Sequence, residues 1–325
     1  MNLHPQAQAV LDTLAAMKLP SPDTIPVALA REQFMRARAS FLAAPEDVAS
    51  CVDHTIPGPA GGIAVRVYRP RGSEAQARLP ALVYLHGGGW VFGNLDSHDP
   101  LCRALANRAQ CAVVSVDYRL APENKFPAAV DDTLAVLRYI GSEGGALGID
   151  GARLAAAGDS AGGTLAAVAA LEFRDRGGPR LALQVLLYPA TDLAMTAPSY
   201  SRLGQGYMLT RERMLYFRNA YLRTTQDIDD WRASPLKAPD LSRLPPALVI
   251  TASHDPLVDE GKAYADRLST AGVPVTYRCC DGMLHGFLTM AGAIDAGKAA
   301  IDEIGAALRH ALAAAAPSPA RPIPG

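Results

Sequence analysis

The chain has 325 residues, of which 49% are hydrophobic and 19% are charged. This composition is typical of a globular protein with a sizeable core, and it excludes an intrinsically disordered chain. The formal net charge of −1 gives no attraction to nucleic acid or to an anionic membrane, so we expect neither partner and favour a small, uncharged or apolar ligand.

The cysteines and the apolar segments narrow the class of protein further. The five cysteines have no repeated C-x-x-C spacing, so we expect neither a zinc site nor a disulfide framework. Cys279 and Cys280 lie in an apolar, strand-like run, where buried free thiols are expected. The N-terminus has no basic start followed by an apolar core, and no apolar run reaches the length of about 18 residues that spans a membrane. We therefore expect a soluble, cytoplasmic protein.

The first part of the chain, residues 1–45, is predicted to be helical. Pro20, Pro22 and Pro26 break it into two pieces, and the second piece, residues 27–42, is amphipathic. The segments 52–56 and 63–68 then flank a turn rich in proline and glycine. An antiparallel hairpin is the natural interpretation of this pattern.

From residue 81 onward, short apolar segments alternate with helical ones. Near-continuous apolar runs are typical of strands that are covered on both faces. We expect strands over residues 81–85, 111–116, 153–157, 181–187, 247–251 and 275–280, and helices over 100–109, 127–140, 161–173, 258–269 and 294–314. This alternation predicts an α/β fold with a parallel sheet and helices on both of its faces.

Two segments interrupt or follow the alternation. Residues 191–235 are too long for an ordinary strand-to-helix connection and contain a helical run over 211–222. We interpret them as an insertion that forms a helical cap together with residues 1–45, and assign residues 46–190 and 236–314 to the α/β core. The tail, residues 315–325, is rich in Ala, Pro and Ser, and we expect it to be disordered.

A candidate nucleophile lies between the strand 153–157 and the helix 161–173. The sequence Gly158-Asp159-Ser160-Ala161-Gly162 has the pattern Gly-x-Ser-x-Gly. Between a strand and a helix, this pattern places the serine on a strained turn with its hydroxyl exposed above the sheet. The pentapeptide alone is weak evidence, because glycine and serine are common in ordinary turns.

A serine hydroxyl needs a base and a group that orients the base. Of the seven histidines, His285 follows the strand 275–280 after a short loop, 281–284, at the sheet edge where α/β proteins assemble their sites. Asp255 follows the strand 247–251 at the same edge. Asp259 is a second choice, but it falls in a first helical turn, where acids favour the helix dipole. The order Ser160, Asp255, His285 is that of the α/β-hydrolases.

A glycine run supplies candidate donors for a developing oxyanion. The sequence His-Gly-Gly-Gly-Trp at residues 86–90 directly follows the strand 81–85. Without side chains, its backbone N–H groups can face a ligand, so we assign Gly88, Gly89 and Ala161 to an oxyanion hole. A dinucleotide site is the alternative use of this run, but Phe92 stands where the third glycine of that motif is required.

Five motifs together resemble one known family, the bacterial hormone-sensitive-lipase-like carboxylesterases (family IV). In chain order they are His-Gly-Gly-Gly-Trp at 86–90, Asp-Tyr-Arg-Leu-Ala-Pro-Glu at 117–123, Gly-Asp-Ser-Ala-Gly-Gly at 158–163, Asp-Pro-Leu-Val-Asp-Glu-Gly at 255–261 and His-Gly-Phe at 285–287. The resemblance implies an eight-stranded, mostly parallel α/β-hydrolase sheet flanked by helices, with a helical cap. It also implies hydrolysis of short- to medium-chain acyl esters by Ser160, Asp255 and His285. Dimerisation is common in this family, so a homodimer is possible.

Other motif residues are expected to have structural roles. We expect Asp117, Arg119 and Glu123 to hold loops beneath the site by buried polar pairing, His86 to position the glycine run, and Asp192 to fix its own loop. Several large side chains could line a substrate pocket, although each could equally belong to the core: Trp90, Tyr188, Tyr207, Met208 and Phe287.

The sequence thus predicts a serine carboxylesterase that works through an acyl-enzyme on a small ester and requires neither a metal nor an organic cofactor. A ligand-binding receptor on a hydrolase scaffold would not need a complete triad. An amidase or carbamate hydrolase would use the same three residues, and the sequence does not separate it from an esterase.

Overall fold

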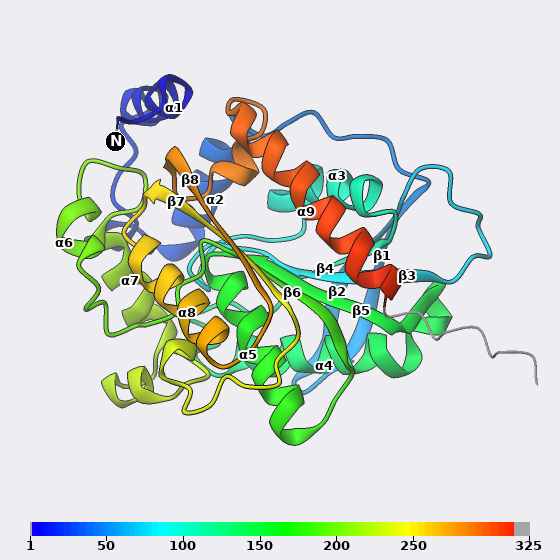
Figure 1. Ribbon diagram of the computed structural model, residues 1–325. Helices are drawn as coiled ribbons and strands as arrows, with labels where there is room; N and C mark the ends of the chain where they lie inside the picture. The colour runs from blue at the N-terminus through cyan, green and yellow to red at the C-terminus, as the bar shows by residue number, and fades with distance from the viewer. Residues whose placement is uncertain (1, 315–325) are drawn as a thin grey trace, which may run out of the picture.

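The computed structural model describes residues 2–314, which are organised around an eight-stranded sheet (Figure 1). The strand order across the sheet is β1-β2-β4-β3-β5-β6-β7-β8. The strands are β1 (Ser50–Gly58), β2 (Gly61–Arg69), β3 (Leu79–Leu85), β4 (Ala112–Val116), β5 (Ile149–Asp159), β6 (Leu181–Leu187), β7 (Ala247–His254) and β8 (Val275–Leu284).

The pairing of the strands explains why the sheet is mostly parallel. The hairpin β1–β2 is antiparallel, and β2 also runs antiparallel to β4. From β4 to β8 every neighbouring pair is parallel, so the carboxyl ends of these strands meet at one edge. The predicted α/β-hydrolase fold is therefore confirmed.

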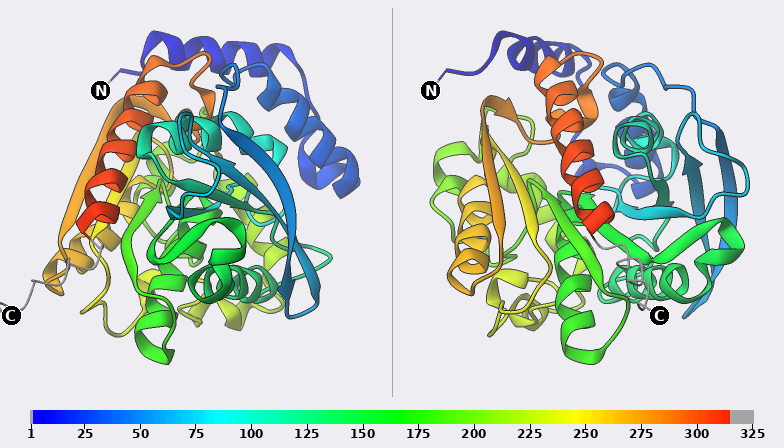
Figure 2. Two further views of the ribbon diagram at one scale, coloured as in Figure 1. Left: turned by 90° about the vertical axis from the view of Figure 1, so that its right-hand side faces the viewer. Right: turned by 45° about the vertical axis from the view of Figure 1, so that its right-hand side comes forward.

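Helices cover both faces of the sheet, as the two views of Figure 2 show. Helices α3 (Asp99–Ala109) and α9 (Asp295–Ala314) pack against each other on one face. Helices α4 (Ala128–Glu143), α5 (Ala161–Arg176) and α8 (Val258–Thr270) lie on the other. Because side chains alternate along a strand, β3 contributes Leu82 and Tyr84 to one core and Ala81, Val83 and Leu85 to the other.

The N-terminal helices lie across one end of the molecule (Figure 2). They are α1 (Pro5–Ala16), a 3-10 turn (Pro22–Thr24) and α2 (Val27–Ala39). Arg31 fastens α2 to the body of the protein, because it donates hydrogen bonds to the carbonyl oxygens of Val91 and Ala121 and forms an ion pair with Glu123 at 2.7 Å. Within residues 2–314, no helix has the length and apolar character to cross a membrane.

The segment 191–235 contains α6 (Ser199–Leu203) and α7 (Arg211–Tyr221), followed by a 3-10 helix (Thr225–Asp229). Together with α1 and α2, it lines an open cavity of about 820 Å³. The wall of this cavity includes Phe34, Arg38, Phe41, Tyr207, Met208 and Met290. Residues 315–325, which we expect to be disordered, lie outside the described residues.

Three details differ from the sequence-based expectations. Residues 281–284 continue strand β8 rather than forming a loop, because a shift in register after Ala252 restores pairing with β7, so that His254 pairs with Leu284. The short helix α6 was not predicted. Cys280 is buried, but Cys279 is only half-buried, because it lies on the other side of the strand.

A buried glutamate secures the point at which the chain leaves β6 for the segment 191–235. Glu260, in the first turn of α8, is 1% exposed and accepts hydrogen bonds from the backbone N–H of Thr191 at 2.8 Å and of Asp192 at 3.4 Å. Burial raises the pKa of this carboxyl well above its ordinary value of 4.5. Its second oxygen, Oε2, has no hydrogen-bond partner among the described residues.

Replacing Glu260 by Gln should stabilise the protein in a pH-dependent way. Because the folded-state pKa is raised, the folded chain keeps a proton that the unfolded chain loses, and stability falls as the pH rises through the unfolded value. We expect Glu260→Gln to increase the free energy of unfolding by about 1–3 kcal/mol at pH 8 and by much less at pH 5. Denaturant unfolding at both pH values measures this, with Glu212→Gln on the exposed start of α7 as the control. An equal effect at both pH values would contradict it.

Candidate active site

Ser160 occupies the turn between strand β5 and helix α5. Its backbone has φ 55° and ψ −119°, in a region that residues with a side chain rarely adopt and that costs on the order of 1–3 kcal/mol. Its N–H donates to the carbonyl oxygen of Leu187 at 2.8 Å, which fixes the turn to the neighbouring strand β6. This strained turn is the strand-to-helix turn that the Gly-x-Ser-x-Gly pattern predicts.

The glycines of the motif are needed because the backbones approach closely. A Cβ atom on Gly162 would overlap the carbonyl oxygen of Leu85, and one on Gly158 would overlap the backbone of Gly162. Helix α5 can therefore begin directly against strand β3. This packing leaves the Ser160 hydroxyl at the carboxyl edge of the sheet.

The structure brings Ser160, His285 and Asp255 together in that order. His285 Nε2 lies 3.0 Å from Ser160 Oγ, and its Nδ1 lies 2.7 Å from Asp255 Oδ2. Asp255 is fully buried after β7, and its other oxygen accepts a hydrogen bond from the N–H of Leu257 at 2.9 Å. Asp259, the second choice for the acid, instead forms an ion pair with Arg202 at 2.7 Å.

The loop after β3 and the start of α5 present backbone donors. Gly88 and Gly89 have φ 126° and 63°, a region that favours glycine. A Cβ on Gly89 would overlap the ring of Phe217 in α7. Among the hydrogen bonds found within residues 2–314, none is donated by the N–H of Gly88, Gly89 or Ala161. None of these three N–H groups therefore has a partner among the described residues.

A buried carboxylate joins this loop to the turn at Ser160. Asp159 is 3% exposed, and its Oδ1 accepts hydrogen bonds from the N–H of Gly87 at 2.9 Å and the hydroxyl of Tyr84 at 2.8 Å. Nε2 of His98 lies 3.0 Å from the same oxygen. Burial disfavours the charged carboxylate, but His98, Arg38 and Tyr84 outweigh it and hold the pKa of Asp159 well below its usual value. Asp159, next to Ser160, therefore anchors Gly87, next to Gly88.

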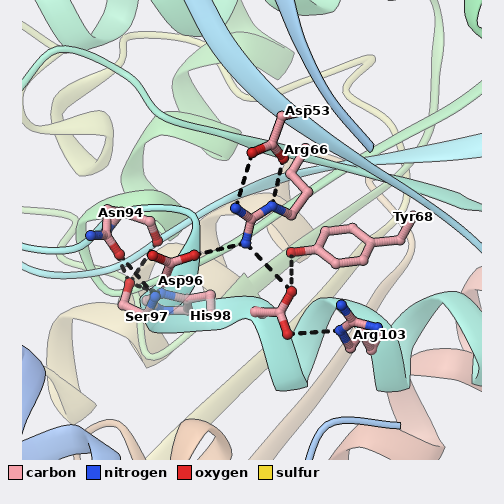
Figure 3. A network of polar contacts seen from close by, with 9 residues as sticks. Asp53, Arg66, Tyr68, Asn94, Asp96, Ser97, His98 and Arg103 are labelled. Carbon is pink, nitrogen blue, oxygen red and sulfur yellow. Dashed lines mark hydrogen bonds and ion pairs between the residues drawn. The ribbon is translucent and has the colours of Figure 1, made fainter. Parts of the chain in front are cut away.

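His98 is itself held by a network of polar contacts (Figure 3). Its Nδ1 lies 2.8 Å from Ser97 Oγ, and Ser97 exchanges hydrogen bonds with Asn94. Around this turn, Arg66 of strand β2 pairs with Asp53 and Asp96 at 2.6 and 2.8 Å, and Asp99 accepts from Tyr68 and pairs with Arg103. The network ties the turn 94–98 to the hairpin and to α3.

His86 has the positioning role expected from the sequence. Its Nδ1 contacts the carbonyl oxygen of Gly87 at 2.9 Å, its carbonyl oxygen accepts from the hydroxyl of Tyr118 at 2.6 Å, and its ring stacks on that tyrosine. Burial, reinforced by His98, lowers its pKa to about 3. At neutral pH His86 is therefore an uncharged spacer that supports the glycine loop.

The predicted loop-holding residues divide into two groups. Arg119 pairs with the buried Asp132 at 2.8 Å, as expected. Glu123 pairs with Arg31 of α2, but its side chain is 51% exposed, so this pairing is not the buried one that was expected. Asp192 accepts a hydrogen bond from the N–H of Ala194 at 3.0 Å and so fixes its own turn. For Asp117 the prediction was wrong, because in the described part of the chain its carboxylate has neither a hydrogen bond nor an ion pair. Burial raises its pKa.

The five candidate pocket residues also divide. Tyr207 and Met208 line the 820 Å³ cavity. The other three, Trp90, Tyr188 and Phe287, are between 0 and 1% exposed. Trp90 stacks on Tyr221 with 4.3 Å between the ring centroids. The rings of Tyr188 and His285 pack edge to face. These three side chains are buried in the core of the described structure and do not line the cavity.

Two methionines of the cavity wall lie near Gly286, the residue that follows His285. A Cβ on Gly286 would lie 3.5 Å from the methyl carbon of Met290 and 4.0 Å from that of Met208, and both methionines line the cavity. Methionine side chains are flexible and adapt to ligands of different shape. In residues 2–314, His, Cys, Asp and Glu form no group of three or more that could hold a metal ion.

Comparisons with known proteins agree with this architecture. Residues 82–289 match the model of the Abhydrolase_3 family, described as α/β hydrolase fold. The chain is 43% identical over 294 residues to carboxylic ester hydrolase LipN of Mycobacterium tuberculosis, covering 87% of this chain and 76% of that protein. It is 39% identical to ethyl acetate hydrolase of Pseudomonas putida, covering 91% and 95%. A solved structure, a hyperthermophilic esterase from the archaeon Pyrobaculum calidifontis, superposes with a TM-score of 0.90 at 44% identity, covering 97% and 100%.

Proposed function

This chain belongs to the α/β-hydrolase family whose model it matches and is a carboxylic ester hydrolase, and we propose that Ser160, His285 and Asp255 catalyse the hydrolysis of short- to medium-chain acyl esters. The observation that carries the assignment of residues is the unbroken series of contacts from Ser160 Oγ through the His285 ring to Asp255, at 3.0 and 2.7 Å. Both distances lie within the range of hydrogen bonds that transfer protons.

In the first half of the reaction, Nε2 of His285 takes the proton of Ser160 Oγ as the oxygen attacks the ester carbonyl. Asp255 accepts a hydrogen bond from Nδ1, which fixes the ring and stabilises the imidazolium. His285 then returns the proton to the departing alcohol, and an acyl-enzyme remains on Ser160. In the second half, His285 activates a water molecule that releases the carboxylic acid and restores the hydroxyl.

We assign the stabilisation of the tetrahedral oxyanion to the N–H groups of Gly88, Gly89 and Ala161. Their lack of other partners among the described residues supports this. So does the position of Ala161 at the first turn of α5, where N–H groups and the helix dipole favour a negative charge. Each such donor typically contributes about 2.7–4 kcal/mol to the transition state.

For the acyl group, we propose the cavity between the N-terminal helices and the segment 191–235, which together act as a cap over the core. Its volume of about 820 Å³ falls in the range of small-molecule sites. The apolar side chains of Phe34, Tyr207, Met208 and Met290 in this lining can contact an acyl chain, and the charged residues of the lining are two acids, Asp12 and Glu212, and two arginines, Arg38 and Arg213. The relative named ethyl acetate hydrolase supports a short acyl group.

A series of p-nitrophenyl esters with acyl chains from C2 to C16 tests this assignment. We expect kcat/KM to be highest at C4 to C8 and to fall by about tenfold or more at C16, in keeping with the short acyl group of the relative named ethyl acetate hydrolase. Ser160→Ala should lower kcat by about 10⁴-fold or more at every length while leaving the unfolding midpoint close to that of the wild type. A maximum at C16 would contradict the chain-length proposal, and turnover retained by Ser160→Ala would contradict the nucleophile.

We also propose that the protein forms a homodimer in solution through strand β8, the edge of the parallel part of the sheet. An edge strand presents unpaired backbone groups that can pair with a second copy of the same strand. Light scattering at micromolar concentration should give twice the chain mass of 34.2 kDa. Replacing Thr276 in β8 by Pro should reduce it to the single mass, whereas a single mass for the wild type would contradict the proposal.

A further inference from the structure

Arg38 is an unusual arginine, because it lies on a surface helix and yet points into the protein. It is 9% exposed, whereas Arg36 on the same helix α2 is exposed. Its Nε donates to the carbonyl oxygen of Ser97 at 3.4 Å, and its Nη2 lies 3.3 Å from Nε2 of His98. Within the described residues, no carboxylate lies in ion-pair distance of its guanidinium.

A buried cation must be compensated, because moving it out of water costs several kcal/mol. Burial lowers the pKa of Arg38, and the Asp159 carboxylate is the largest influence that opposes this effect. Nε2 of His98 lies near both charges, 3.3 Å from Arg38 Nη2 and 3.0 Å from Asp159 Oδ1. One ring nitrogen can accept from Arg38 or donate to Asp159, but it cannot do both at once. Arg38, His98 and Asp159 therefore form one buried polar cluster between helix α2 and the turn at Ser160, in which Arg38 acts on Asp159 through its charge.

The Asp159 end of this cluster contacts the backbone of the glycine loop 87–89. Asp159 Oδ1 holds the N–H of Gly87 at 2.9 Å, and Gly87 precedes the proposed donors Gly88 and Gly89. Asp159 also precedes Ser160, and Ala161 supplies the third donor. The carboxylate thus sits where the two halves of the proposed oxyanion hole join, and its position sets the distance between them.

We propose that Arg38 is a positioning residue for ester hydrolysis, which couples helix α2 to the oxyanion-binding backbone through His98 and Asp159. This rests on the proposed function, since it requires that Gly88, Gly89 and Ala161 bind the oxyanion. Without Arg38, His98 and Asp159 lose a neighbour that fixes their placement, and the glycine loop can shift relative to the turn at Ser160. A loss confined to the transition state lowers kcat and leaves KM nearly unchanged.

A purely structural role for Arg38 makes a different prediction. If the residue only fastened α2, its loss would loosen the cavity wall and raise KM, since Arg38 and Phe34 both line the cavity. Helix α2 has a second fastening, because Arg31 bonds to Val91, Ala121 and Glu123. The helix should therefore stay in place when Arg38 is replaced.

The experiment compares Arg38→Met with Arg36→Met, which removes the same charge from the exposed side of the same helix. Steady-state kinetics on p-nitrophenyl butanoate are normalised to active sites counted with a fluorophosphonate. We expect kcat to fall about tenfold in Arg38→Met with KM within about twofold of the wild type, since a displaced donor costs less than the 10²–10³-fold of a deleted one. Arg36→Met should match the wild type. A raised KM with unchanged kcat, or equal behaviour of the two variants, would overturn the proposal.

A double-mutant cycle tests the route through His98. In the His98→Gln background, Arg38→Met should change kcat by less than about twofold, because the histidine contacts of Arg38 and Asp159 are already lost. A full tenfold effect in that background would overturn the route. If Arg38→Met does not fold, Arg38→Lys replaces it in both comparisons. The single ammonium group of lysine reaches only one of the two groups that Arg38 contacts, the carbonyl oxygen of Ser97 and Nε2 of His98. The loss of the other contact should again lower kcat. Failure of the proposed function would appear separately, as a wild type that fluorophosphonate does not label.

Discussion

The organisation of the site depends on the backbone of Ser160, which is held at a positive φ between a strand and a helix. This conformation persists only because its surroundings define it fully. Gly162 lets helix α5 lie against the end of β3, and the bond from Ser160 N–H to Leu187 fixes the turn to β6. The three central strands of the sheet thus determine where the hydroxyl lies. His285 and Asp255 reach it from β8 and β7, whose carboxyl ends share the same edge.

The buried charges beneath the turn at Ser160 serve geometry more than stability. Removing one member of a buried ionic group is costly, but such a group often adds little stability compared with a well-packed apolar core. Asp159 is useful because its short side chain reaches the N–H of Gly87 from the residue next to Ser160. One carboxylate then controls two separate stretches of backbone. His98, Tyr84 and Arg38 hold that carboxylate ionised, and the network of Figure 3 holds His98.

The sequence allowed the sheet to be predicted, together with the polar side chains that meet at its carboxyl edge, because their signals are local. An apolar run bounded by polar residues marks each parallel strand, and a side chain placed just after such a run falls at the carboxyl edge. That rule selects Asp255 and His285. It also tolerates errors at strand ends, and so the extension of β8 to Leu284 did not disturb the choice of His285.

The features that the sequence did not reveal join distant parts of the chain. Arg38 and His98 are 60 positions apart, and neither has a motif that identifies the other. Trp90 and Phe287 end the motifs at 86–90 and 285–287, which made them candidates for the pocket. In the structure their side chains are buried in the core. The absence of a partner for Asp117 likewise depends on the packing of loops around it. One signal for the polar contacts around Asp159 is present in the sequence: a carboxylate between a buried strand and a helix needs polar partners.

Mass-spectrometric mapping of a fluorophosphonate probe tests the central claim, that the fold activates the hydroxyl of Ser160, most directly. Folded protein, protein unfolded in urea, and His285→Gln are treated with the probe under equal conditions. We expect one probe per folded chain, on the peptide that contains Ser160, with labelling slowed by at least about 10³-fold in urea and in His285→Gln. A probe attached to another residue, or equal labelling of folded and unfolded chains, would contradict it.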